Sequence, residues 1–154
     1  MCKNIEEMLS SIDDKSKKTW ILLDTETTGL KGCEEEQLTQ IAGKSCKYNL
    51  INNTFKDFNV FNKKIKLNEN SIKRLKDEND KISWVLDFNG YEKGNHVYYE
   101  EKLVIGDLLT FCNTHFPCML MAQNSDFDMD MLNGRSEYKF TQEVFDSLNL
   151  YRKI

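Results

Sequence analysis

The feature that most constrains this chain is a short apolar run that ends abruptly in a carboxylate-rich hexapeptide. Residues 20–23, Trp-Ile-Leu-Leu, are followed at once by residues 24–29, Asp-Thr-Glu-Thr-Thr-Gly. The apolar run predicts a buried strand that ends at a functional loop. Residues two apart on an extended chain share one face, so Asp24 and Glu26 can face the same pair of cations. Gly29 permits a tight turn directly after them.

A second apolar run, residues 118–122, is followed by Gln-Asn-Ser-Asp-Phe-Asp at residues 123–128. The run predicts another buried strand, and the polar segment opens a helix that we expect to end at Asn133-Gly134. Asp128 would lie in the first helical turn, where the helix dipole favours an anion. From there its carboxylate can face the end of the first strand. The competing interpretation is that Asp126, Asp128 and Asp130 are ordinary N-terminal helix charges; the first motif disfavours it.

The rest of the chain predicts an α/β domain with a mixed sheet. Its length, 154 residues, suits one domain. The residues between 82 and 91 are ambiguous between strand and helix, and residues 62–66 read as a basic turn. We expect strands at 38–48, 54–65 and around 144–145, a short helix at 71–75, an amphipathic helix at 99–115 that ends before Pro117, and the start of a last helix after residue 145.

Taken together, the two motifs resemble those of the DnaQ-like, or DEDD, 3′→5′ exonuclease superfamily, of the proofreading-exonuclease and ribonuclease T type. The first family motif, D-T-E-T-T-G, is intact at residues 24–29, and the second, N-x-x-F-D, stands at residues 124–128. Gln123 occupies a position where a histidine is common. The segments Gln-Ile-Ala at 40–42 and Asp-Ser-Leu at 146–148 are similar to weaker family features. The resemblance therefore spans residue 19 to the C-terminus and implies a ribonuclease H-like mixed sheet flanked by helices.

The resemblance also implies a two-metal-ion hydrolysis of phosphodiester bonds at the 3′ end of single-stranded DNA or RNA. Asp24 would bridge both ions, Glu26 would hold the ion that activates water, and Asp128 would hold the other. Carboxylate oxygens suit Mg²⁺ or Mn²⁺. The residues implied to contact the terminal nucleotide are Thr25, Thr27, Thr28, Gly29, Leu30, Asn124 and Phe127, of which Phe127 can instead pack onto the core.

The sequence departs from the family at the third motif, Y-x-x-x-D or H-x-x-x-x-D, which supplies the last ligand and the general base. Tyr138 is followed four residues later by Gln142, and His96 and His115 both precede the second motif. We therefore expect a single exonuclease domain over residues 1–154 that lacks its C-terminal helix, with a helical extension at residues 1–18. The uncovered side would expose strand residues such as Leu22 or Leu120 and favour self-association.

Two other interpretations stay open. One is a catalytically inactive nucleic-acid-binding or protein-interaction module on the same fold; the other is a ribonuclease H-like nuclease of another family. The net charge of −4 argues against broad nonspecific nucleic-acid binding but suits an acidic metal site. Five cysteines without a CxxC pair argue against a disulfide framework or a thiolate zinc site. We expect no membrane segment and an intracellular, cytoplasmic location.

Overall fold

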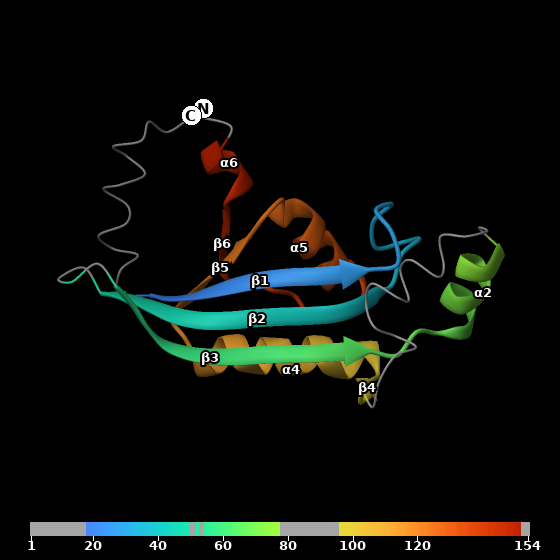
Figure 1. Cartoon of the computed structure of the whole chain (residues 1–154), viewed down its shortest axis with the longest axis horizontal. Coiled ribbons are helices and arrows are strands. Elements are labelled where there is room, and N and C mark those ends of the chain that lie inside the picture. Colours follow the sequence, from blue (N-terminus) through green and yellow to red (C-terminus); the bar gives the residue numbers. More distant parts are fainter. Residues whose placement is uncertain (1–17, 50–51, 53, 78–95, 152–154) are drawn as a thin grey trace.

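A computed structural model of the chain describes residues 18–49, 52, 54–77 and 96–151 (Figure 1). Three long strands come first, and helices then alternate with short strands. In chain order the elements are β1 (Thr19–Thr27), β2 (Leu38–Asn49), β3 (Thr54–Ile65), α2 (Glu69–Asp77), β4 (Tyr98–Tyr99), α4 (Glu101–Thr114), β5 (Cys118–Ala122), α5 (Ser125–Gly134), β6 (Glu143–Asp146) and α6 (Leu148–Tyr151).

In the part of the chain that the structure describes, the strands form one six-stranded mixed sheet in the order β4-β3-β2-β1-β5-β6. β1, β2 and β3 are consecutive antiparallel neighbours, whereas β5 is parallel to β1 and β6 is parallel to β5. Parallel neighbours require crossover connections, and the connection from β5 to β6 runs through α5. The predicted ribonuclease H-like mixed sheet flanked by helices is confirmed.

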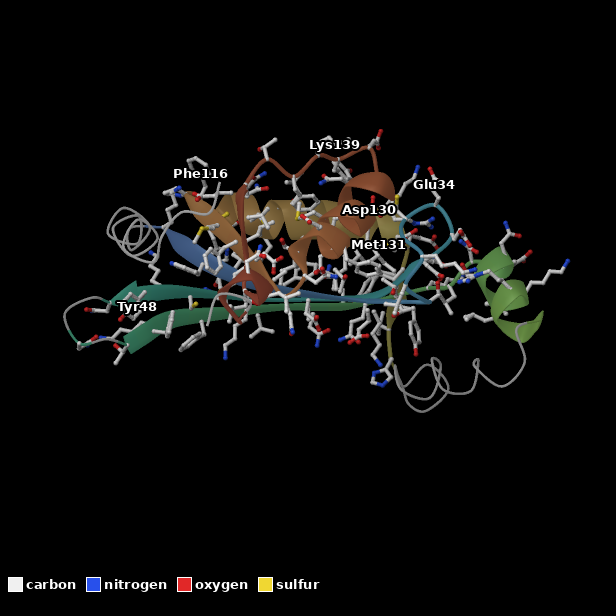
Figure 2. All side chains as sticks on the ribbon, turned by 90° about the horizontal axis from the view of Figure 1, so that it is seen from above. Glu34, Tyr48, Phe116, Asp130, Met131 and Lys139 are labelled. Atoms are coloured by element: carbon white, nitrogen blue, oxygen red, sulfur yellow. The ribbon has the colours of Figure 1, made fainter. Side chains whose placement is uncertain are left out.

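The core lies between the sheet and α4, which runs along β3 (Figure 1). Figure 2 shows α4 and α5 on the same side of the sheet. This arrangement follows from strand alternation, because odd-numbered β1 residues face the helices. The largest fully buried side chains include Ile21, Leu38, Ile41, Ile65, Ile105, Leu108, Met119, Leu120, Met131 and Leu132.

The opposite face of β1–β3 carries exposed apolar side chains. Leu22 is 41% exposed and Val60 is 70% exposed, so the expectation that Leu22 would be uncovered is confirmed. The same expectation for Leu120 is wrong, because Leu120 pairs with Ile21 and, like it, is fully buried.

Several element boundaries differ from those expected. β1 continues through Thr27, because its pairing with β2 continues to Leu38. Residues 62–65, expected as a turn, are the end of β3 paired with β2. The ambiguous segment at 82–91 and all but the last residue of the extension expected at 1–18 lie outside the described residues. Within the described ranges, no helix is long and apolar enough to cross a bilayer.

Candidate active site

The end of β1 presents two carboxylates on the sheet face opposite α4. Asp24 and Glu26 alternate with the half-buried Thr25, and they pair with Ala42 and Gln40 of β2. Burial raises the pKa of Glu26, and the nearby charge of Asp24 raises it further. The two side chains therefore lie close enough to repel each other, which is the electrostatic setting that a bound dication would relieve.

α5 brings Asp128 to the same strand end. β5 pairs with β1 only as far as Leu22, so the edge of β1 beyond that point has no β5 neighbour. There the backbone N–H of Thr25 donates to Oδ1 of Asp128 at 3.1 Å, and the Thr25 hydroxyl donates to the same oxygen at 2.6 Å. A carboxylate from the first turn of a helix thus takes the place of a strand partner, 103 positions along the chain from Thr25.

The buried carboxyl of Asp128 is electrostatically coupled to β1. Burial raises its pKa, the hydrogen bond from Thr25 lowers it, and the charge of Asp24 raises it again, with a raised pKa as the net result. Asp24 therefore interacts with both Glu26 and Asp128.

All three side chains offer the hard oxygen ligands that Mg²⁺ and Mn²⁺ prefer. Across the described residues, however, no group of three or more His, Cys, Asp or Glu side chains is close enough to hold a metal ion. The donor chemistry fits a divalent cation, but the carboxylates must draw together to bind one.

The loop that follows β1 is fixed by a buried ion pair with α2. Arg74 of α2 donates to both carboxylate oxygens of Glu36, which is 2% exposed, and to the Thr28 hydroxyl at 3.0 Å. Thr28 in turn donates to Glu36 at 2.6 Å and accepts from the Gln37 backbone N–H at 2.9 Å. A side chain at Gly29 would place its Cβ 2.4 Å from a Glu36 oxygen, so this position requires glycine.

The same loop is also tied to α5. The backbone N–H of Cys33 donates to Asp130 at 3.0 Å, and Arg135 donates to the Cys33 carbonyl at 3.2 Å. Arg135 also forms a two-pronged ion pair with Glu101 at the start of α4. The loop is therefore held by α2 and α5 at once.

A left-handed elbow joins β5 to α5 and sets the position of Asp128. Asn124 has φ 60° and ψ 50°. Its backbone N–H donates at 3.0 Å to Asp146 at the end of β6, and the same Asp146 oxygen accepts from Leu148 N–H at 2.9 Å. Asp146 thus fixes the elbow from the neighbouring parallel strand.

The other residues named from the sequence fall into different environments. Leu30 is 87% exposed in the loop, whereas Phe127 is partly buried against the core. The Thr27 hydroxyl donates to the Gly29 carbonyl at 2.6 Å.

Neither histidine lies at the carboxylates. The ring of His115 is 2.8 Å from the Phe111 carbonyl and 3.1 Å from the Ser45 hydroxyl, and the ring of His96 packs against Tyr98.

Sequence reasoning did not identify Glu36, Arg74 or Asp146 as residues that position the site. Asp146 had a signal, since it stands in the Asp-Ser-Leu segment noted above. Glu36 and Arg74 had none, because their pairing spans 38 positions and depends on the placement of α2.

Comparison with known proteins finds a solved structure of similar fold. No protein-family model and no curated protein matches the chain. Among solved structures it is similar to Escherichia coli Exonuclease I in complex with a dA16 oligonucleotide, with a TM-score of 0.53, 15% identity and coverage of 88% of this chain. The match covers 29% of Exonuclease I, so the chain spans less than a third of that enzyme.

A second similar structure is cell-death related nuclease 4 (CRN-4), with a TM-score of 0.38 and 15% identity, covering 69% of this chain and 35% of that one. At this TM-score the second likeness carries no argument. The first, at 15% identity, shows the fold alone.

Proposed function

We propose that this chain is a metal-dependent 3′→5′ exonuclease domain that hydrolyses single-stranded DNA or RNA. The observation that carries the proposal is the double hydrogen bond from Thr25 to Asp128, which joins the second motif to the residue between Asp24 and Glu26. The exonuclease fold supports it at the level of architecture. We propose the cytoplasm as its location, because a chain without a disulfide framework suits a reducing compartment.

In this proposal Asp24 would be a ligand shared by both ions, Glu26 would help to hold the ion that activates water, and Asp128 would help to hold the other. When bound, Mg²⁺ or Mn²⁺ supplies an activated water and charge stabilisation for the in-line displacement. The carboxylates of the chain would hold and orient the ions that supply this chemistry. Because Glu26 and Asp128 have raised pKa values, cation binding competes with protonation and strengthens as the pH rises.

The loop after β1 forms the proposed site for the terminal nucleotide. Leu30 is an exposed apolar residue of this loop, and beside it the Thr27 hydroxyl donates to the Gly29 carbonyl. The buried Thr28 contributes by fixing the loop through Glu36. On the α5 side, Thr25 and Asn124 hold Asp128 and its elbow, and Phe127 supports them from the core.

The test is degradation of a 5′-labelled single-stranded oligonucleotide with Mn²⁺, compared with EDTA. We expect a slow ladder that shortens from the 3′ end, and no ladder when the 3′ end is blocked. The rate should be low, because no Y-x-x-x-D or H-x-x-x-x-D pattern follows Asp128 in this sequence and a general base typically contributes about 10²- to 10⁴-fold. Vigorous activity would show that the chain supplies its own base, and release of mononucleotides from the 5′ end would refute the proposed polarity.

A second candidate is an inactive nucleic-acid-binding module on this fold. One observation favours it: the three carboxylates are not arranged closely enough to hold a metal ion as the structure stands. The two functions differ in one respect that can be measured. A binding module retains single strands equally well in Mn²⁺ and in EDTA and leaves them intact.

A further inference from the structure

β2 contains a bulge opposite the end of β1, where Glu26 lies. The register between β1 and β2 shifts between Glu26 and Thr27, and the shift leaves Thr39 without a partner in β1. The alternation of buried and open positions breaks at the same point, because the adjacent residues Leu38 and Thr39 are both buried. A bulge bends its strand and increases the local twist, and bulges beside active sites re-aim side chains. The orientation of Glu26 relative to Asp24 therefore depends on this bulge.

The bulged conformation leaves one polar group unsatisfied. The Thr39 hydroxyl is buried and finds no hydrogen-bond partner among the described residues. A buried hydroxyl without a partner destabilises the folded state, because it has lost its bonds to water. Contacts from elements other than β1 and β2 must therefore stabilise the bulge.

Glu101, the first residue of α4, supplies such a contact. The pairing of β2 with β3 begins at Gln40, so the backbone N–H of Leu38 lies beyond the part of β2 that β3 covers. This N–H donates to Oε1 of Glu101 at 3.1 Å. A largely buried carboxylate, 12% exposed, thus accepts the hydrogen bond that a longer β3 could have accepted.

Arg135 fixes this carboxylate and connects it to α5. Nε of Arg135 donates to Oε1 of Glu101 at 3.1 Å, and Nη2 donates to Oε2 at 2.8 Å. A two-pronged pair of this kind is specific in geometry, so it sets the orientation of the carboxylate. Arg135 directly follows α5, the helix whose first turn contains Asp128. One ion pair therefore links the strand beside Glu26 to the helix that carries Asp128.

We propose that Glu101 is a positioning residue for Glu26. It holds the β2 bulge that orients the end of β1, and its ion pair with Arg135 keeps that strand end aligned with α5. Glu101 acts through the backbone of Leu38 and not through contact with an ion. Its effect on metal binding rests on the proposed function, whereas its effect on the end of β1 does not.

Backbone amide NMR of the metal-free protein tests the inference directly. Glu101→Ala removes the acceptor of the Leu38 amide, which should then exchange faster with solvent. We also expect the amide signals of Glu26 and Thr27 to shift. Glu101→Gln keeps an oxygen acceptor at the same place and should restore most of these signals. Asp107→Asn is the matched control, since it breaks another ion pair of α4, with β3, and should leave them unchanged.

Mn²⁺ titration of the same variants measures the consequence for the site. Changing a residue that orients a metal ligand typically lowers metal affinity about 10- to 100-fold. We expect a loss of roughly tenfold in Glu101→Ala, a smaller loss in Glu101→Gln and none in Asp107→Asn. Should Glu101→Ala fail to fold because Arg135 has lost its anion, Glu101→Ala/Arg135→Met and Glu101→Gln/Arg135→Met give the same comparison without a buried unpaired charge.

Two results would overturn the inference. One is a Glu101→Ala protein in which the amide signals of Glu26 and Thr27 stay at their wild-type positions. The other is a wild type that binds Mn²⁺ while Glu101→Ala and Asp107→Asn bind it equally well. Shifted amides in Glu101→Ala, together with a wild type that binds no Mn²⁺, would support the inference and refute the proposed metal site.

Discussion

Replacing Asp24 by asparagine is expected to reduce the Mn²⁺-dependent shortening of a 5′-labelled oligonucleotide to the level seen in EDTA. Asp24 is the carboxylate that interacts electrostatically with both Glu26 and Asp128, so its charge is common to both proposed ion positions. Loss of that charge therefore weakens the binding of both ions. Asp126→Asn is the matched control, because Asp126 stands in the same first turn of α5 as Asp128 but is exposed.

The same substitution should make the metal-free protein more stable at neutral pH. The folded-state pKa values of Glu26 and Asp128 are raised, partly by Asp24. Both carboxyls have pKa values of about 4 in the unfolded chain and higher pKa values in the folded protein. The folded state therefore loses stability as the pH rises from the unfolded-chain pKa values through the folded-state pKa values. Removing the charge of Asp24 reduces that loss, so thermal melts in EDTA should show a higher Tm at pH 7 and little change at pH 3. Lower stability together with lower activity would instead indicate a structural role for Asp24.

The second large effect concerns the ion pair beneath the loop. Arg74→Met leaves the carboxylate of Glu36, 2% exposed, without its cation. Breaking a buried pair in this way costs about 3–5 kcal/mol, and the partial exposure of Arg74, 26%, places the expected loss near the lower end. Urea unfolding measures it, with Lys73→Met on the same helix as the control.

The double variant Arg74→Met/Glu36→Gln distinguishes the cause of this loss. With Glu36 replaced by glutamine as well, no unpaired charge remains buried at this position, and we expect a substantial part of the stability to return. A double variant as unstable as Arg74→Met alone would show that Arg74 acts through packing and not through charge.

The sheet was predictable because its signals are local. The apolar run before Asp24 and the run at residues 118–122 are strands in the structure, and the antiparallel pair β2–β3 follows from two long stretches of β-forming residues. The end of β1 was not predictable from the same signals. Polar residues after Leu23 suggested a loop, whereas pairing with β2 keeps Asp24 through Thr27 in the strand.

The carboxylates of the candidate site could be predicted from the sequence, but the residues that hold them in position could not. Motif spacing identifies Asp24, Glu26 and Asp128 as candidate ligands of a single site. It does not indicate that Thr25 supplies both donors to Asp128 or that Asp146 fixes the elbow at Asn124. Those contacts depend on where β5 ends relative to β1 and on the parallel placement of β6, which are properties of the assembled sheet.

The central claim is that Asp24, Glu26 and Asp128 form one site for divalent cations. It is tested most directly by titrating Mn²⁺ into the wild-type chain, Asp128→Asn and Asp126→Asn, with binding followed by calorimetry and by the rise in Tm that a ligand of the folded state produces. The account predicts binding by the wild type and by Asp126→Asn and a clear loss in Asp128→Asn. Equal Mn²⁺ binding by all three proteins, or by none of them, would contradict it.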